Sequence, residues 1–200
     1  MTRVLVTGFE PFDRAEVNPS QLVVETLDGD VAKAVLPVSY ARAADALRAA
    51  VRDTDPDVVI CFGQADGRPG ISVERFAHNL DEAETTDNDA APGSGAPIDA
   101  GGPAAYRSTL PVDEIVASLR REHIPAAPSR DAGGFLCNHV FYVLMRELDL
   151  HRPGAIGGLV HIPLVPEQAL DKTVASMPLE SLVRAARVIV GACVQRRSPS

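Results

Sequence analysis

The chain has 200 residues, of which 46% are hydrophobic, with 16 prolines and 15 glycines. This size fits one compact domain over residues 1–200, because no shift in composition marks a second one. The net charge of −8 disfavours a nucleic-acid partner, and the lack of a bilayer-length apolar run or signal-peptide pattern predicts a cytoplasmic protein without a membrane partner.

Hydrophobic periodicity predicts strands that alternate with helices. Strands are expected over residues 2–7, 33–38, 57–62, 71–77, 124–128 and 155–162, and helices over 18–27, 41–55, 113–122, 137–148 and 179–193. Asn18 and Asp113 are the expected N-caps of two of these helices, and residues 195–200 are expected to form a frayed tail. The alternation predicts an α/β sandwich with a largely parallel or mixed sheet.

Residues 81–103 are polar and contain several glycines, which predicts a long loop or loose hairpin over the sheet. A loop of this length in a small domain is usually functional or mobile. We interpret the Asp and Glu residues of 81–89 as a solvated acidic segment. No metal site is predicted, since the histidines lack HxH or HxxxH spacing.

The three cysteines lack CxxC spacing, so they form neither a disulfide framework nor a zinc site and suit a reducing compartment. Cys61 and Cys193 lie in apolar patterns and are expected to be small core residues. Cys137 differs, because the turn Gly133-Gly134 precedes it and an apolar helical pattern follows it. The start of a helix favours the thiolate, which is the nucleophile. Position alone leaves a structural and a nucleophilic interpretation of Cys137 open.

Polar residues at strand ends are candidates for chemistry, because reactive groups in open α/β sheets collect where strands pass into loops. These candidates are Glu10, Gln64, Glu74, Cys137 and His161. A nucleophilic cysteine needs an imidazole to take and return its proton, and a third group to orient that imidazole.

The nearest histidine is not the best candidate for the base. His139 lies two residues from Cys137 and therefore on another helix face, so we expect a packing or capping role for it. His161 follows an apolar strand and precedes Ile162-Pro163, which places it at a sheet end, although a satisfied core histidine is an equal interpretation. Glu74 is placed either to accept an imidazole N–H or to pair with a neighbouring arginine.

Several longer motifs occur in a fixed order along nearly the whole chain. They are Thr7-Gly8-Phe9-Glu10-Pro11-Phe12 with Val17-Asn18-Pro19-Ser20, Gly63-Gln64-Ala65 followed by Glu74-Arg75, Gly101-Gly102-Pro103-Ala104-Ala105-Tyr106, Gly133-Gly134-Phe135-Leu136-Cys137-Asn138-His139, and His161-Ile162-Pro163 with Pro166-Glu167-Gln168. Together they resemble the motifs of the pyroglutamyl peptidase I family, also called pyrrolidone-carboxylate peptidases.

The resemblance implies a cysteine exopeptidase that removes N-terminal pyroglutamate from peptides through a thioester acyl-enzyme and needs no cofactor. It implies a single catalytic domain over residues 1–200, folded as a three-layer α/β/α sandwich related to purine nucleoside phosphorylases. Members of the family are often tetramers, so a homo-oligomer is expected. Peptides with an N-terminal pyroglutamyl group are the expected partners.

Carried over by position, the resemblance assigns three catalytic roles. Cys137 would be the nucleophile, His161 the base and acid, and Glu74 the group that orients His161. The backbone N–H of Cys137 would donate to the oxyanion. The substrate-binding residues implied by the resemblance are Phe9, Phe12, Asn18 and Gln64. An apolar slot with few amide partners suits pyroglutamate, because this group has no α-ammonium.

Two positions depart from the family pattern. Glu84 stands ten residues after Glu74, where the family has an arginine associated with the substrate pocket and oxyanion side. Either Glu84 points to solvent, Arg75 or Arg68 replaces the missing cation, or activity is weak and the chain is a lactam-binding relative. A hydrolase with another substrate is a further alternative. Asp13 stands where a glycine is usual.

Overall fold

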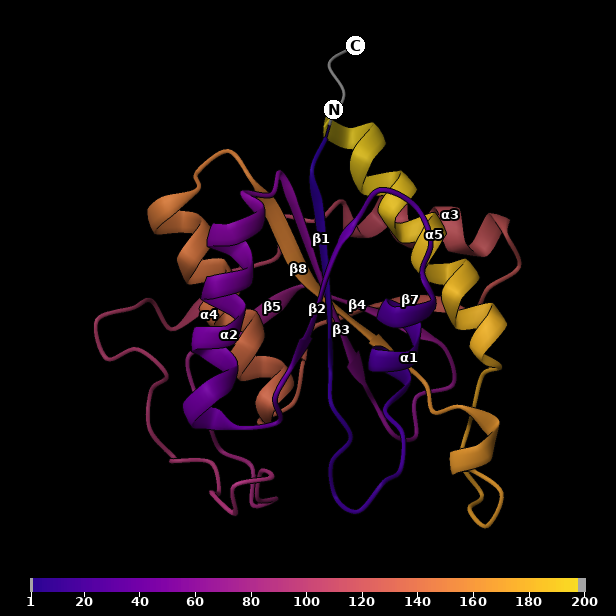
Figure 1. The fold of residues 1–200 in the computed structure, drawn as a ribbon, viewed down its shortest axis with the longest axis horizontal. Helices are drawn as coiled ribbons and strands as arrows, with labels where there is room; N and C mark the ends of the chain where they lie inside the picture. Colours follow the sequence, from indigo (N-terminus) through magenta and orange to yellow (C-terminus); the bar gives the residue numbers. More distant parts are fainter. Residues whose placement is uncertain (1, 198–200) are drawn as a thin grey trace.

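The computed structural model describes residues 2–197, which form three layers (Figure 1). A central sheet is covered on one face by two helices and on the other face by three. The first pair is α2 (Tyr40–Thr54) and α4 (Leu136–His151), and the other three are α1 (Pro19–Thr26), α3 (Val112–Arg121) and α5 (Leu179–Arg197). The predicted three-layer α/β/α sandwich is therefore confirmed. Among the described residues, no helix is both long and apolar enough to cross a membrane.

The central sheet has the strand order β2-β1-β3-β8-β4-β7. Its strands are β1 (Val4–Phe9), β2 (Ala32–Leu36), β3 (Val58–Gln64), β4 (Ile71–Glu74), β7 (Ala126–Ser129) and β8 (Ile156–Ile162). All neighbours are parallel except β4 and β8, which are antiparallel. The carboxyl ends of β1, β3 and β8 therefore meet at one edge, where Figure 1 shows the β1–α1 loop and the short helix η1 (Pro166–Gln168).

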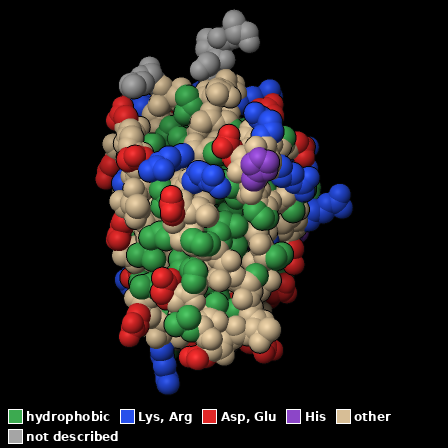
Figure 2. Space-filling model, turned by 90° about the vertical axis from the view of Figure 1, so that its right-hand side faces the viewer, with side chains coloured by type: hydrophobic (Ala, Val, Ile, Leu, Met, Phe, Trp, Pro, Cys, Tyr) green, Lys and Arg blue, Asp and Glu red, His purple; other side chains and the backbone are tan. Residues whose placement is uncertain are grey.

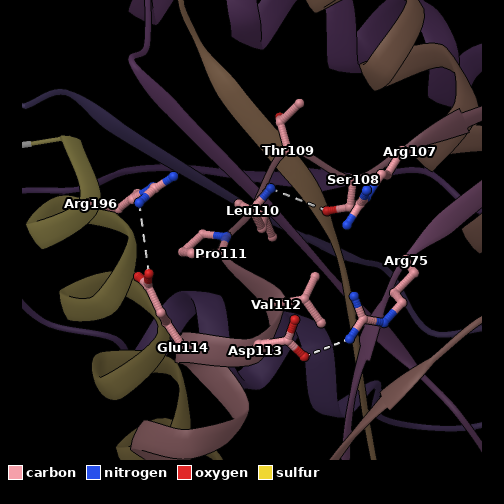
Figure 3. A pocket seen from close by; sticks show the side chains of 10 residues that line it. All are labelled: Arg75, Arg107, Ser108, Thr109, Leu110, Pro111, Val112, Asp113, Glu114 and Arg196. Carbon is pink, nitrogen blue, oxygen red and sulfur yellow. Dashed lines mark hydrogen bonds and ion pairs between the residues drawn. The ribbon is translucent and has the colours of Figure 1, made fainter.

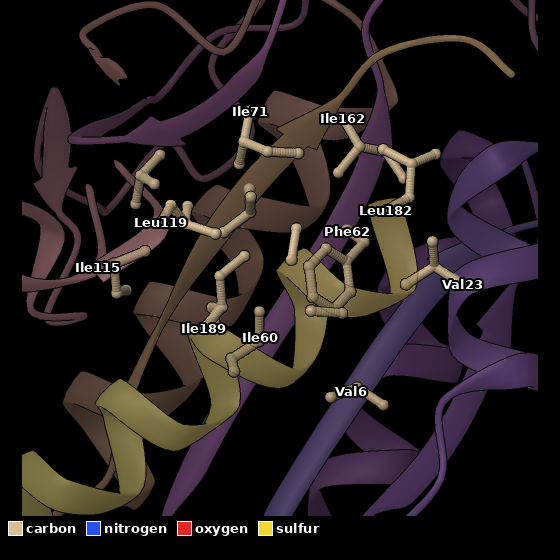
Figure 4. Packing of buried hydrophobic residues seen from close by; sticks show 14 of the residues in the cluster. Val6, Val23, Ile60, Phe62, Ile71, Ile115, Leu119, Ile162, Leu182 and Ile189 are labelled. Carbon is tan, nitrogen blue, oxygen red and sulfur yellow. The ribbon is translucent and has the colours of Figure 1, made fainter. Parts of the chain in front are cut away.

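Two apolar layers, one on each face of the sheet, hold the helices in place. Neighbouring residues of β1 point to opposite layers, since successive side chains of a strand alternate between faces. Val6 packs with Ile60 and Phe62 beneath α1, α3 and α5 (Figure 4), whereas Leu5 packs beneath α2 and α4. All four side chains are fully buried. The continuous apolar runs in the sequence thus correspond to strands that are covered on both faces.

Charged side chains of both signs cover the side of the molecule on which α3, α5 and η1 lie. Figure 2 shows apolar side chains between them, and Lys and Arg gathered in the upper half of the view. The negative net charge of the chain is therefore not concentrated on this face.

The element boundaries differ from the prediction in several places. Helix α3 follows Pro111, and its first turn contains Asp113, which was expected at the N-cap. The extended segment 71–77 is interrupted at Arg75, after which β5 (Phe76–His78) pairs with the unpredicted β6 (Ala105–Arg107) in a separate sheet. Helix α5 includes residues 195–197 of the expected tail, whereas residues 198–200 lie outside the described chain.

The acidic segment 81–89 is solvated only in part: Glu82, Glu84 and Asp89 are exposed, as the sequence suggested, whereas its other two carboxylates are buried. Asp81 and Asp87 are each only 6% exposed. The Asp87 carboxylate accepts hydrogen bonds from the backbone N–H groups of Tyr40 (2.8 Å), Asp89 (2.9 Å) and Ala91 (2.8 Å). The segment is therefore fixed to the start of α2, because buried carboxylates require such partners.

Candidate active site

Cys137 lies in the first turn of α4, and the next two residues fix this turn to the end of β5 and to the chain that follows it. The side-chain amide of Asn138 donates to the backbone oxygens of His78 (2.9 Å) and Leu80 (3.0 Å). A ring nitrogen of His139 lies 2.9 Å from the Asp81 carboxylate. His139 thus has the packing role predicted for it. Since the first N–H groups of a helix have no intrahelical acceptor, the N–H of Cys137 is available to an anion.

His161 and Glu74 are connected across two neighbouring strands. In the antiparallel register of β4 and β8, His161 lies opposite Ser72, so Glu74 is its diagonal neighbour on the same face. Nδ1 of His161 lies 2.8 Å from Oε1 of Glu74, and both residues are buried, at 4% and 0% exposure. This geometry suits the tautomer in which Nδ1 carries the proton and donates to the carboxylate, which leaves Nε2 free to act as a base.

Gly63 provides the space in which Cys137 and His161 approach each other. It is the partner of His161 in the parallel register of β3 and β8. A β-carbon at position 63 would lie 2.7 Å from Sγ of Cys137 and 3.4 Å from Nε2 of His161. Sγ and Nε2 thus flank one point in space, without a hydrogen bond between them. Such contacts commonly shorten only when substrate binds.

Arg68 pairs with the buried Glu74 carboxylate, so Glu74 has both of the partners that the sequence left open, an imidazole and an arginine. Its guanidinium donates to Oε1 of Glu74 (2.6 Å) and to the backbone oxygen of Asp131 (2.8 Å). A buried carboxylate without such a cation would favour its neutral form. Arg75, in contrast, donates to Asp113 (2.6 Å). The guanidinium groups of both arginines are therefore occupied by other carboxylates.

The Cys137 thiol is harder to ionise than its place at a helix start suggested. Burial raises its pKa to about 12, and the Glu74 carboxylate acts in the same direction, whereas Arg68 lowers the pKa. The residue retains partial solvent exposure. Desolvation is the largest influence on this pKa, and it opposes the thiolate that a helix start favours. At neutral pH the resting residue is a thiol, which needs a base to activate it.

The pH dependence of the alkylation of Cys137 by iodoacetamide should reflect this raised pKa. Because the thiolate fraction keeps growing up to a pKa of about 12, the rate constant should rise about tenfold per pH unit between pH 7 and 10. Mass-spectrometric mapping at each pH measures the rate, and the buried Cys61 and Cys193 serve as internal controls that should not react. A plateau already reached below pH 8 would show instead a standing thiolate.

A small pocket of about 40 Å³ opens beside Cys137. Its lining includes all four residues predicted to bind substrate, and consists of Phe9, Phe12, Asn18, Val38, Gln64, Phe135, Leu136 and Cys137. The rings of Phe12 and Phe135 pack at a centroid distance of 5.9 Å. The structure therefore brings the predicted nucleophile and the predicted binding residues to one cavity.

Asn18 lines this pocket, but its amide is engaged in capping α1. Oδ1 accepts from the backbone N–H (3.0 Å) and the hydroxyl (2.8 Å) of Ser20, and Nδ2 donates to the backbone oxygen of Glu10 (3.1 Å). The hydroxyl of Ser20 in turn accepts from the N–H of Phe9 (2.9 Å). Asn18 thereby positions the β1–α1 loop that carries Phe9 and Phe12.

Gln64 is oriented by Gln168 of η1. The amide of Gln168 donates to Oε1 of Gln64 (3.2 Å) and to the backbone oxygen of Val17 (3.2 Å). Because Oε1 of Gln64 is the acceptor in this pair, its amide nitrogen is left to donate to another group. Gln168 is a positioning residue. It belongs to one of the sequence motifs, but only the structure shows its contact with Gln64.

Glu10, predicted as a candidate for chemistry, has a structural role. Its Oε1 accepts from the backbone N–H of Val38 (2.9 Å) and from the amide of Asn88 (3.0 Å). Asn88 also donates to the backbone oxygen of Pro11 (3.0 Å). Glu10 thus ties the β1–α1 loop to the loop 81–103 and fixes Val38 in the pocket wall.

The turn after Phe12 explains why a glycine suits position 13. Asp13 and Arg14 have positive φ angles of 51° and 61°, and the N–H of Ala15 donates to the backbone oxygen of Phe12 (3.0 Å). A turn with two such central residues favours Gly, Asn or Asp. Asp13 tolerates this conformation, whereas Arg14 is strained in it.

Replacing Arg14 by glycine should stabilise the fold. Removal of the left-handed strain outweighs the added flexibility of the unfolded chain, so Arg14→Gly should raise the free energy of unfolding by about 0.5 kcal/mol. Urea denaturation measures the change. As a matched control, Arg184→Gly on the exposed side of α5 should lower it by about 1 kcal/mol. Destabilisation by Arg14→Gly would contradict the assigned strain.

Glu84 is exposed and makes no ion pair among the residues that the structure describes. It lies between the buried Asp81 and Asp87, whose contacts fix the segment on either side. The first of the three alternatives for this position, a side chain that points to solvent, therefore fits the structure.

A second cavity, of about 300 Å³, contains none of the predicted site residues (Figure 3). It lies at the start of α3, where Arg75 pairs with Asp113 and Arg196 lies 3.8 Å from Glu114. The charged groups of this cavity thus pair largely with one another.

A thiol beside an imidazole that a buried carboxylate orients is the arrangement that cysteine hydrolases use. The family model described as pyroglutamyl peptidase matches residues 2–196. The chain is 46% identical over 198 residues to a pyrrolidone-carboxylate peptidase of Clavibacter michiganensis, with 96% of this chain and 92% of the relative covered. It is 42% identical to the one of Bacillus subtilis, with 93% and 89% covered.

Solved structures agree with the sequence matches. The crystal structure of pyroglutamyl peptidase I from Bacillus amyloliquefaciens superimposes with a TM-score of 0.94 at 40% identity, with 98% of both chains covered. A mutant pyrrolidone carboxyl peptidase from Pyrococcus furiosus gives a TM-score of 0.94 at 34% identity, with 98% of this chain and 100% of the other covered. The chain belongs to the pyroglutamyl peptidase family.

Proposed function

We propose that the protein hydrolyses the amide bond after an N-terminal pyroglutamyl group, with Cys137 as nucleophile. One arrangement carries this proposal: Glu74 contacts His161, and Nε2 of His161 and Sγ of Cys137 both face the space at Gly63 beside a small aromatic pocket. The family membership supports pyroglutamyl peptides as the substrate class.

The first half of the reaction forms a thioester. Nε2 of His161 takes the proton of the Cys137 thiol while Sγ attacks the pyroglutamyl carbonyl carbon. The N–H of Cys137 donates to the oxyanion of the tetrahedral intermediate. The carbon–nitrogen bond then breaks, and Nε2 gives its proton to the leaving amine. Glu74 stabilises the imidazolium that exists between these two proton transfers.

The second half regenerates the thiol. A water molecule takes the place of the leaving amine and loses a proton to Nε2 of His161 as it attacks the thioester carbonyl. The carbon–sulfur bond breaks, pyroglutamate is released, and the thiolate recovers its proton from the imidazolium. No cofactor takes part in either half of this proposed cycle.

The pocket suits a neutral lactam. Phe9 and Phe12 offer apolar surface to the ring, and the free amide nitrogen of Gln64 can donate to a carbonyl of the pyroglutamyl group. A substrate with an α-ammonium would lose its hydration without gaining a counter-charge in this pocket. Pyroglutamate is therefore favoured over a free N-terminal residue.

A panel of fluorogenic amides tests this proposal. Wild-type protein should release the amine from the pyroglutamyl amide, and at least about a hundredfold more slowly from the glutaminyl and prolyl amides. Nucleosides and free lactams in the same panel address a hydrolase with another substrate. Lack of pyroglutamyl amide cleavage, together with turnover of another compound, would refute the proposal.

The charge at Glu84 supports a second candidate, a weakly active or non-catalytic lactam-binding relative. A carboxylate near the oxyanion would raise the barrier where the family arginine would lower it. The exposure of Glu84 weighs against such a contact. Pyroglutamate binding without turnover by the wild type, with activity gained in Glu84→Arg, would favour this candidate over the peptidase.

The proposal includes a cytoplasmic homotetramer. Free cysteines, of which Cys61 and Cys193 are buried, suit a reducing compartment, and the family resemblance supports the assembly. Light scattering on purified protein should give four times the 21.2 kDa mass of the chain. The monomer mass at micromolar concentration would contradict the tetramer.

A further inference from the structure

A wider groove adjoins the small pocket beside Cys137. Phe12 and Gln64 line both cavities, so the groove continues directly from the pocket. It runs between the β1–α1 loop and the segment that contains η1 and Lys172, and it has a volume of about 800 Å³. This is within the range of cavities that hold ligands much larger than a pyrrolidone ring.

The proposed reaction requires a place for the peptide that leaves. This peptide is attached to the carbonyl that Cys137 attacks, while the pyrrolidone ring occupies the small pocket. An extended chain advances roughly 3.3–3.6 Å per residue, so the first residues after pyroglutamate must pass the mouth of the pocket. The groove beyond Phe12 and Gln64 lies at that mouth.

Carboxylates outnumber cations on the groove wall. The negatively charged lining residues are Asp13, Glu16, Asp66 and Glu167, and the positively charged ones are Arg14 and Lys172. Lys172 already lies 3.9 Å from Asp66. Among the described residues, the carboxylates of Asp13, Glu16 and Glu167 make no ion pair and are exposed to solvent. Arg14 is also exposed and makes no ion pair within the described part of the chain, so three unpaired carboxylates and one unpaired guanidinium leave a net charge of −2 on the wall.

The departure at Glu84 adds to this charge. Glu84 directly precedes Thr85, which lines the groove. Where the family pattern has an arginine, this chain therefore places a further exposed carboxylate next to the groove. Glu84 therefore makes the surroundings of the groove more negative, whether or not it affects the oxyanion.

We propose that this groove binds the leaving part of pyroglutamyl peptides and selects peptides with Lys or Arg at the first two positions after the pyroglutamyl residue. The inference rests on the proposed function and specifies its substrates. A single exposed ion pair has a small effect, of about two- to fivefold. Several carboxylates acting on two adjacent cationic residues together should give about a tenfold preference over acidic residues.

Three peptide amides test the preference: pyroglutamyl-Lys-Lys, pyroglutamyl-Ala-Ala and pyroglutamyl-Glu-Glu. The expected order of kcat/KM is Lys over Ala over Glu, with about tenfold between the first and the last. In the double variant Glu16→Gln/Glu167→Gln this ratio should fall to about threefold. The ratio should also fall in 1 M NaCl, where the Debye length is about 3 Å.

Glu122→Gln is the matched control, because it removes the same charge from an exposed residue at the end of α3 that does not line the groove. It should leave the ratio at its wild-type value. Equal kcat/KM for the three peptides, or a ratio that the double variant does not change, overturns the inference while the peptidase activity stands. Failure to cleave any pyroglutamyl substrate, the simple fluorogenic amide included, refutes the proposed function itself.

Discussion

Replacing Cys137 by alanine should lower kcat/KM for a pyroglutamyl amide by at least about 10⁴-fold. The variant retains the pocket, the helix start and the His161–Glu74 pair, but it has no atom that can form the acyl-enzyme. Substrate binding should therefore persist. Stopped-flow or fluorogenic assays measure the rate, and calorimetry measures the binding of pyroglutamate to the inactive variant.

Cys193→Ala is the matched control for this change. It removes a thiol from the inner side of α5, in the apolar layer that lies across the sheet from the pocket. Stability should fall slightly because a core atom is lost, but kcat/KM should stay within about twofold of wild type. A Cys137→Ala or Cys137→Ser variant with more than a tenth of the wild-type rate would contradict Cys137 as nucleophile.

Replacing Glu74 by glutamine should lower kcat by about 10³- to 10⁴-fold with little change in KM. Glutamine has nearly the same shape, but it lacks the charge that stabilises the imidazolium of His161 and it can present the wrong group to Nδ1. The effect should fall on kcat because Glu74 acts on the proton transfers of His161 and does not line the substrate pocket. Arg68 loses its carboxylate partner in the same variant, so the unfolding free energy must be measured in parallel.

A second histidine–carboxylate pair in the chain provides the control for Glu74→Gln. Asp81→Asn changes the partner of His139, which packs against the loop 81–103 and not beside Gly63. This variant should lose stability, while the folded fraction keeps kcat within about fivefold of wild type. Equal losses of kcat in both variants would contradict the assigned role of Glu74 in orienting His161 for the reaction.

The sheet and most helices could be predicted because their cause is local. Continuous apolar and helical patterns predict a strand over 57–62 and a helix over 41–55, close to the observed β3 (Val58–Gln64) and α2 (Tyr40–Thr54). Strand β6 was missed because three residues, two of them exposed, carry no such pattern. The buried state of Asp81 and Asp87 was missed because their partners, His139 and the start of α2, lie far along the chain.

The residues of the candidate site were predictable from motifs, but their geometry was not. Cys137, His161 and Glu74 come from three segments, and only the strand register brings them together. Gly63 acts through Cys137 and His161, which lie far along the chain, and nothing in the local sequence specifies these partners. The pKa of Cys137 was predicted in the wrong direction, because the helix start is visible in the sequence and the desolvation is not.

The central claim is that the pyroglutamyl group is carried by Cys137. Wild-type protein should be mixed with excess pyroglutamyl amide, quenched in acid within one turnover, digested and examined by mass spectrometry. We expect one pyroglutamyl group on the peptide that contains Cys137, removable by hydroxylamine as a thioester and absent from Cys137→Ala. Rapid turnover with the acyl group on another residue would contradict it.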